Sequence, residues 1–143
     1  MPSLDYPLQD GYVHHWLVAG PRAQTISDLA SFQGLDPRRQ IAGRYHRQDA
    51  EMPALLNKGQ RPQERATAIT GTELTWRYQA SLDDHLLDVA ETYPTPQHLT
   101  AWAYVELISP YAQQVDLTLS VYGPADLWLN GLHVHRHERF SDL

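Results

Sequence analysis

Three histidines stand at alternate positions in the stretch HVHRH, and this spacing is the one best suited to chemistry in the sequence. On a β-strand, His133, His135 and His137 would project from one face, with successive Cβ atoms about 7 Å apart. Two imidazoles at this spacing can bind a transition metal. The alternative is the solvent-facing side of a hairpin, where the histidines need no ligand. We favour that alternative and expect no bound metal, with His133 and His135 as the ligands of the less favoured hypothesis.

The histidines follow an Asn-Gly pair, which is the strongest short-range signal for a β-hairpin. A type I′ turn requires positive φ at both central residues, which suits Asn130 and Gly131. The sequence therefore predicts antiparallel strands near residues 125–129 and 132–136, with the facing pairs Leu129–Leu132, Trp128–His133, Leu127–Val134 and Asp126–His135. The aliphatic residues would share the core face, and the histidines would share the opposite face with Asp126 and Trp128.

Trp128 is the tryptophan best placed for exposure, because it lies on the face opposite the leucines. An indole ring beside an imidazole is a surface on which a sugar ring can stack. The candidate carbohydrate site therefore consists of Trp128, His133, His135 and Asp126. Trp76 is expected in the core instead, since the alternating stretch ELTWRYQ places it on one face with Leu74 and Tyr78.

A second polar cluster, DDHLLD, contains Asp83, Asp84, His85 and Asp88. Its composition suits a hard cation, although it lacks the Gly and Glu spacing of an EF-hand. The alternative is a polar turn leading into a strand. We expect no cofactor, and a structural calcium ion at Asp83 and Asp84 is the alternative that this cluster leaves open.

Catalytic constellations are weak in this chain. G-x-S-x-G, Gly-rich phosphate-loop and H-E-x-x-H motifs are all missing from the sequence. Glu106 and Asp116 fall on neighbouring expected strands and could form a carboxylate pair, but acids on any sheet can do so by chance. We therefore expect no stand-alone enzymatic activity.

Composition excludes several further classes of function. The 143-residue chain has a formal charge of −6 and scattered basic residues, which disfavours nucleic acid and anionic membrane surfaces. It contains no cysteine, so disulfides, thiolate catalysis and sulfur-ligated zinc are excluded. The N-terminal stretch has no signal-peptide pattern, and no apolar run approaches the roughly 18 residues of a membrane span. A cytoplasmic location is expected.

Strand patterns dominate the rest of the chain. Aromatic, β-branched or alternating runs predict strands over residues 12–20, 73–79, 101–109 and 114–123, with Gly20-Pro21 and Pro110 as terminators. A short helix is expected near residues 24–32, where Ile26, Leu29 and Ala30 form an apolar stripe. Short strands separated by turn residues are typical of an all-β, antiparallel β-sandwich.

The order of these motifs resembles a known domain family. WLVAGP early in the chain, then Trp76 with LLDV, AYVELISP and finally LTLSVYGPADLWLNGLHV are similar to jelly-roll, galactose-binding-like β-sandwich domains. Such domains are accessory modules of large bacterial carbohydrate-active and uncharacterised proteins. The matching positions are Trp16, Gly20, Pro21, Trp76, Asp88, Ala103, Tyr104, Ser109, Pro110, Trp128, Asn130 and Gly131. The resemblance covers most of the chain except residues 22–70, and it implies a fold without naming a ligand.

The resemblance implies one domain over residues 1–143, the N-terminal part of a longer protein. In these domains a further strand usually follows the Asn-Gly hairpin, whereas this sequence continues only to FSDL. We expect either that the last strand is missing or that the sheet is completed in another way. A missing strand would leave an edge able to pair with a second copy of the chain or with a downstream domain.

The leading functional hypothesis is a non-catalytic module that binds carbohydrate or a protein partner. One alternative is a small, cupin-like, metal-dependent enzyme that uses the strand containing His133, His135 and His137. Cupin-like sites also take a histidine from a later strand, and we expect no such strand after HVHRHE. The other alternative is a purely structural or dimerising domain.

Overall fold

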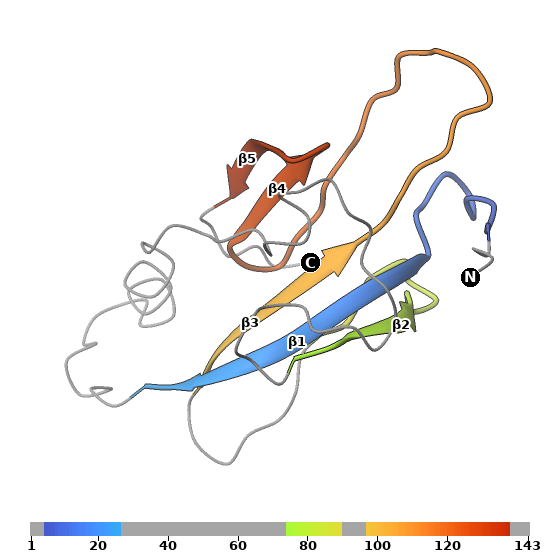
Figure 1. Cartoon of the computed structure of the whole chain (residues 1–143). Helices are drawn as coiled ribbons and strands as arrows, with labels where there is room; N and C mark the ends of the chain where they lie inside the picture. Colours follow the sequence, from blue (N-terminus) through green and yellow to red (C-terminus); the bar gives the residue numbers. More distant parts are fainter. Residues whose placement is uncertain (1–4, 27–73, 90–96, 138–143) are drawn as a thin grey trace.

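The computed structural model describes residues 5–26, 74–89 and 97–137. These residues contain five β-strands. They are β1 (His15–Thr25), β2 (Trp76–Ala80), β3 (Gln97–Tyr104), β4 (Ala125–Leu129) and β5 (Leu132–His137). A three-stranded antiparallel sheet has the order β2-β1-β3, and β4 and β5 form a separate two-stranded sheet (Figure 1). The described residues are therefore all-β with antiparallel pairing, as the sequence predicts.

The three-stranded sheet has one face rich in aromatic residues. In the β1–β2 register Leu17 pairs with Tyr78 and Ala19 with Trp76, and directly facing residues lie on the same side of an antiparallel pair. On the other edge of β1, Leu17 pairs with Tyr104 and Ala19 with Trp102. Leu17 and Ala19 are thus flanked by rings from both neighbouring strands.

The core of the described chain lies on this face. Trp76 and Ala19 are fully buried, and the partly buried side chains around them are Leu17, Leu74, Trp102 and Tyr104. The ring centroids of Trp76 and Tyr104 lie 6.4 Å apart in an edge-to-face arrangement. The expected core position of Trp76 is confirmed. Tyr78 shares its face, as expected, but is 45% exposed.

Strand β1 continues past Gly20-Pro21, so the expected strand terminator is wrong. The pairing with β3 shifts between Ala19 and Arg22, which accommodates the proline in a bulge. Gly20 has φ +103°, and a Cβ atom there would lie 2.9 Å from the carbonyl oxygen of Thr100. Only glycine fits this close approach of β1 to β3 without a shift of backbone.

The helix expected near residues 24–32 is wrong where the structure describes it. Ala23, Gln24 and Thr25 pair in succession with Leu99, His98 and Gln97 of β3. Pairing along this edge determined the conformation of residues 24 and 25 as strand, because a tertiary partner overrides a weak local helix pattern. Residues 27–32 lie outside the described part of the chain.

The β4–β5 hairpin confirms the predicted turn. Asn130 and Gly131 have φ +50° and +81°, and Leu129 pairs with Leu132 as expected. Trp128 faces His133, also as expected. Beyond this pair a bulge shifts the register, so that Leu127 faces His135 and Asp126 faces Arg136. The predicted pairs Leu127–Val134 and Asp126–His135 are therefore wrong, because a sequence pattern does not show where an extra residue enters a strand.

The aliphatic residues of the hairpin were expected in the core. Leu129, Leu132 and Val134 are instead 51%, 67% and 47% exposed, respectively. Alternation along a hairpin shows which residues share a face, but it does not supply the second layer that would cover that face. The predicted core face is thus open to solvent along most of its length.

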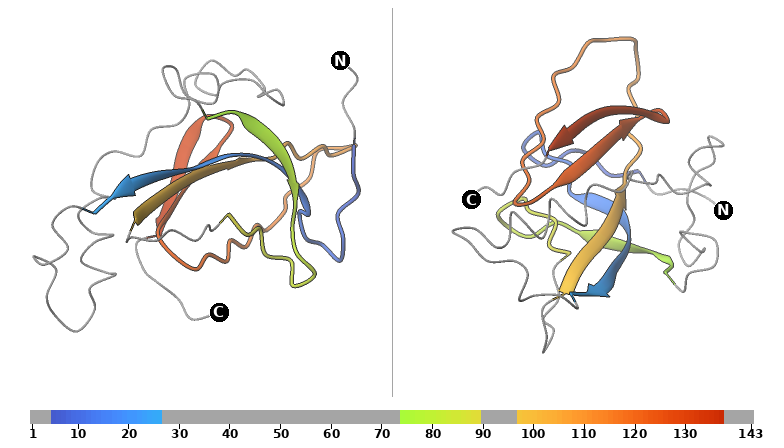
Figure 2. Two further views of the ribbon diagram at one scale, coloured as in Figure 1. Left: turned by 90° about the horizontal axis from the view of Figure 1, so that it is seen from below. Right: turned by 90° about the vertical axis from the view of Figure 1, so that its left-hand side faces the viewer.

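The long segment between β3 and β4 differs most from the sequence prediction. β3 ends at Tyr104 rather than at residue 109, and residues 105–124 contain no strand. This segment, orange in Figures 1 and 2, extends away from both sheets as a long loop. Residues 114–123, which alternate most regularly in the sequence, were therefore wrongly predicted as a strand with a buried face. Their alternation lacks a neighbouring strand in the described chain.

In the described ranges, the chain forms no helix with the length and apolarity that crossing a lipid bilayer would require.

Candidate functional site

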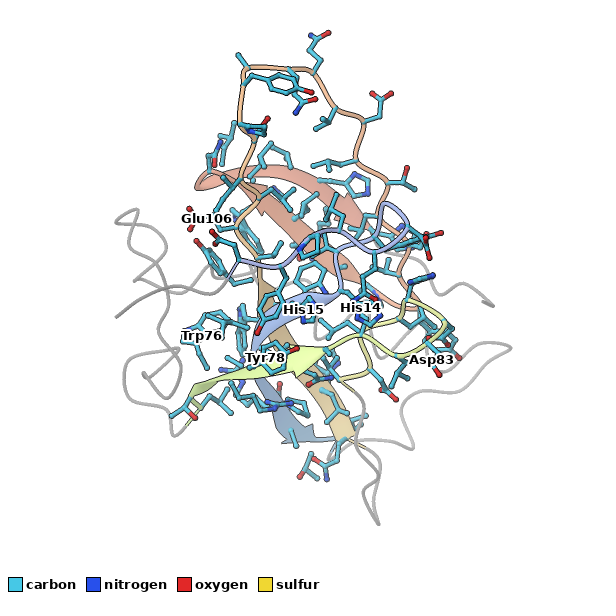
Figure 3. All side chains as sticks on the ribbon, turned by 90° about the vertical axis from the view of Figure 1, so that its right-hand side faces the viewer. His14, His15, Trp76, Tyr78, Asp83 and Glu106 are labelled. Atoms are coloured by element: carbon cyan, nitrogen blue, oxygen red, sulfur yellow. The ribbon has the colours of Figure 1, made fainter. Side chains whose placement is uncertain are left out.

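Six rings gather where β1 begins and where the chain leaves β2. We call this group the ring cluster, and its members are Tyr6, Tyr12, His14, His15, Tyr78 and His85. The sheet register explains part of it. His15 pairs with Ala80 and Leu17 with Tyr78, so His15 and Tyr78 share the face that carries Trp76. Figure 3 shows His14, His15 and Tyr78 close together, with Trp76 farther along β2.

His15 and Tyr78 are in direct contact at the centre of this cluster. Nδ1 of His15 and the hydroxyl group of Tyr78 are hydrogen-bonded at 2.6 Å. Their ring planes differ by 20° and their centroids are 5.8 Å apart, so the two rings are nearly parallel. Tyr6 covers the imidazole, with its ring centroid 3.9 Å from that of His15 and a 19° angle between the planes. The Tyr6 and Tyr78 centroids are 6.2 Å apart and their planes differ by 28°, so all three rings are close to parallel.

A second stacked pair continues the cluster. The rings of Tyr12 and His85 lie 4.0 Å apart and are parallel to within 1°. His14 meets His85 and His15 edge-on, at centroid distances of 6.0 and 5.8 Å. Its Nε2 donates a hydrogen bond of 3.2 Å to the carbonyl oxygen of Leu82. His14 therefore connects the two stacked pairs into one continuous array of rings.

Two turns position the rings of Tyr12 and His85 in this array. Gln9 and Tyr12 are joined by two backbone hydrogen bonds, and Asp10 and Gly11 between them have positive φ, as in a hairpin turn. This turn places Tyr12 where its ring stacks on that of His85. His85 has φ +66° in the turn after β2, a conformation uncommon outside glycine.

The turn after β2 contains the cluster that was considered for calcium. The Oδ1 atom of Asp84 accepts a hydrogen bond of 3.1 Å from the backbone N–H of Leu86, and Leu82 N–H donates to the Leu86 carbonyl. Asp83 is exposed on this turn (Figure 3). The carboxylate of Asp84 thus closes a turn in the way that aspartate commonly does.

The hairpin brings together part of the carbohydrate site that the sequence predicts. Nε2 of His133 donates a hydrogen bond of 2.8 Å to Oδ1 of Asp126, whose side chain is 5% exposed while that of His133 is 45% exposed. Trp128 contacts His133, with centroids 5.1 Å apart and planes tilted by 58°. Arg136 adds a positive charge 4.0 Å from the same carboxylate oxygen. We call Asp126, Trp128, His133 and Arg136 the hairpin site.

Two features of the hairpin site differ from expectation. Trp128 is only partly exposed rather than open to solvent. The bulge moves His135 opposite Leu127, which places it on the other face from Asp126 and His133. There it lies near His137, with centroids 6.4 Å apart. A single inserted residue therefore separates the alternate histidines that the sequence pattern would put on one surface.

Metal ligation can be judged from the same geometry. Over residues 5–26, 74–89 and 97–137, no three His, Asp or Glu side chains come close enough together to hold a metal ion. This applies to His133 and His135 and to Asp83 and Asp84. Glu106 and Asp116, weighed above as a carboxylate pair on adjacent strands, both lie in the loop after β3 instead.

The ring cluster was missed by sequence reasoning. Its central hydrogen bond joins residues 63 positions apart, and Tyr12 and His85 are separated by a similar length of chain. Alternation in the β2 region correctly puts Tyr78 on the face of Trp76, but it does not name the neighbouring strand. The only sign of this cluster in the sequence is the adjacent pair His14-His15 near the start of the predicted strand over residues 12–20.

No family model matches the chain, and the searches of curated proteins and of solved structures found no match either.

Proposed function

We propose that this protein is a non-catalytic module that binds carbohydrate through the ring cluster. The proposal includes a jelly-roll-type β-sandwich fold, which the resemblance to galactose-binding-like domains implies. The described strands are compatible with such a fold because they are antiparallel and form two sheets.

The observation that carries the proposal is the group of three nearly parallel rings formed by Tyr6, His15 and Tyr78. Flat aromatic surfaces bind the apolar faces of sugar rings, and their polar tips supply hydrogen bonds to hydroxyl groups. Tyr6 and Tyr78 are 48% and 45% exposed, so a ligand can reach both rings.

The hydrogen bond between His15 and Tyr78 supports this role because it holds these two rings in one orientation before a ligand binds. A side chain that is already ordered loses less conformational entropy on binding. The hydroxyl groups of Tyr6 and Tyr78 and the imidazole nitrogens of His15 are the polar groups that this cluster can offer to sugar hydroxyls. Such a surface selects for ring shape and hydroxyl pattern rather than for charge.

The hairpin site is the second candidate for the same function. His133 donates Nε2–H to Asp126, so its other ring nitrogen, Nδ1, is the one left for a ligand on a side chain that is 45% exposed. The 58° tilt between His133 and Trp128 forms a corner rather than a flat surface. One ring face and one oriented ring nitrogen would suit the edge of a sugar better than its face.

The test is binding to a panel of immobilised glycans, followed by titration of the best ligand against three variants. We expect Tyr78→Ala to weaken binding about fivefold or more, since stacking of a ligand ring on an aromatic side chain contributes roughly 1–3 kcal/mol. Tyr111→Ala is the matched control, because Tyr111 is 66% exposed and lies outside both sites. If Trp128→Ala abolishes binding and Tyr78→Ala does not, the hairpin site replaces the ring cluster. Absence of binding to every glycan would refute the proposal.

A further inference from the structure

The segment between β3 and β4 exposes an apolar stripe with strand-like spacing. Val115, Leu117 and Leu119 are 63%, 57% and 46% exposed, and the intervening side chains Asp116, Thr118 and Ser120 are exposed as well. None of these residues belongs to a strand in the structure. Period-two alternation of this quality is typical of a strand with one buried face, so the segment has the sequence of a paired strand and lacks a partner within the described chain.

This segment is palindromic in residue type. Read outward from Thr118 in either direction, the order is leucine, then a small polar or acidic residue, then valine: VDL-T-LSV. If two copies pair antiparallel with Thr118 facing Thr118, Leu117 faces Leu119 and Val115 faces Val121. Every apolar residue then faces a residue of its own kind, and threonine faces threonine, which is a favourable cross-strand pair.

Charge decides between the two possible directions of pairing. A parallel pair in register would bring the two Asp116 carboxylates together, and like charges at neighbouring positions are destabilising. In the antiparallel pair each Asp116 faces Ser120 of the other copy, so the two carboxylates stay apart. We therefore propose that the protein dimerises through antiparallel pairing of residues 115–121 from two copies, with a two-fold axis at Thr118.

The extent of exposed apolar surface is consistent with such a dimer. Ten large apolar side chains between Leu107 and Val134 are exposed, each by about half. At roughly 60–120 Å² for each fully exposed large side chain, they present on the order of 500 Å² of apolar surface. A standard interface buries about 800 Å² on each partner, of which slightly more than half is apolar. Residues 115–121 would form the centre of this interface.

The geometry of the segment allows a second copy to approach. It extends away from both sheets in the two views that show it from the side (Figures 1 and 2). A two-fold interface uses the same patch on both copies, so one self-complementary strand is sufficient to build it. Exposed strand-like segments with apolar faces pair in this way unless charge or proline prevents it, and proline does not occur between residues 111 and 123.

The first measurement is the molecular mass in solution by light scattering over about 1–100 μM. We expect a monomer–dimer equilibrium. Thr118→Asp places two carboxylates directly opposite each other, and we expect it to weaken dimerisation at least tenfold. Ala112→Asp adds the same charge outside the palindrome and should leave the dimer intact. A protein that stays monomeric throughout this range, or a dimer insensitive to Thr118→Asp, would overturn the proposal.

Two further variants test the register itself. Mixing Thr118→Asp with Thr118→Lys should restore a heterodimer, because the two substituted residues face each other in the proposed alignment. The chain contains no cysteine, so Thr118→Cys introduces a single thiol that can be oxidised. Facing Cα atoms in an antiparallel pair lie about 4.5–5.5 Å apart, within the range of a disulfide. Two Ala112→Cys thiols would be roughly 40 Å apart along the pair, so equal cross-linking at both positions would refute this register.

Discussion

His15 and Tyr78 are 63 residues apart in the sequence, yet the imidazole Nδ1 and the phenol oxygen lie 2.6 Å apart on one face of the sheet. The antiparallel register of β1 and β2 produces this contact, since it sets His15 beside Ala80 and Tyr78 beside Leu17. Tyr6 then stacks on the imidazole from the N-terminal segment. The relationship links the fold to the proposed binding surface, and the first prediction tests it.

Removing only the hydroxyl group of Tyr78 should separate stacking from orientation. In Tyr78→Phe the ring remains, but the hydrogen bond to His15 is lost, at a cost of about 0.5–1.5 kcal/mol at most for a partly exposed pair. We expect ligand affinity to fall less than in Tyr78→Ala. Calorimetric titration of both variants with the same glycan provides the comparison. Equal loss in the two variants would mean that the hydroxyl group, rather than the ring, makes the essential contact.

Replacing Gly20 should destabilise the protein more than replacing Gly11. Both residues have positive φ, but a Cβ atom at Gly20 would meet the Thr100 carbonyl at 2.9 Å, whereas one at Gly11 would meet nothing within 4 Å. We expect Gly11→Ala to lower the free energy of unfolding by about 1 kcal/mol from backbone conformation alone, and Gly20→Ala to lower it further. Urea denaturation monitored by tryptophan fluorescence measures both values. The expectation fails if the two variants unfold at the same urea concentration.

The hairpin turn should depend on φ at Gly131 and not on space. Gly131 has φ +81° and no atom near the position of a Cβ. Gly131→Val should therefore destabilise the protein by about 1 kcal/mol or more, because a β-branched residue resists positive φ. Gly131→Asn should cost much less, since asparagine tolerates the left-handed region. Thermal unfolding of the two variants tests this order, and a valine variant as stable as the asparagine variant would contradict it.

Asp126 should contribute to the stability of the β4–β5 sheet. Its carboxylate is 5% exposed, accepts the Nε2–H of His133 at 2.8 Å and lies 4.0 Å from Arg136. Loss of this buried acceptor in Asp126→Ala should cost about 1–3 kcal/mol, since hydrogen bonds to charged groups exceed neutral ones. Asp126→Asn keeps an acceptor oxygen and should recover part of the loss. Chemical denaturation of the two variants supplies the values, and an alanine variant with wild-type stability would show that the carboxylate is dispensable.

Local patterns in the sequence were sufficient for several elements. The Asn130-Gly131 turn and the pairs nearest to it follow from interactions between residues close in the chain, and alternation in ELTWRYQ predicted that Trp76 faces the core. Such features depend on backbone conformational preference and on side-chain alternation, both of which are visible in a short window of sequence. The same window shows which residues of 114–121 share a face.

Tertiary structure decided the rest, because the sequence does not state which strands become neighbours. Pairing with β3 extended β1 through Gly20-Pro21 and made strand of residues 24 and 25, where a helix was expected. The bulge in β5 separated His135 from His133. The ring cluster arises only when β1, β2 and two turns converge, and residues 114–121 pair with no strand of the described chain despite their alternation. Most of these outcomes depend on the free energy of contacts between segments that are distant in the sequence. The bulge depends on cross-strand pairing within the hairpin, and alternation along one strand encodes neither.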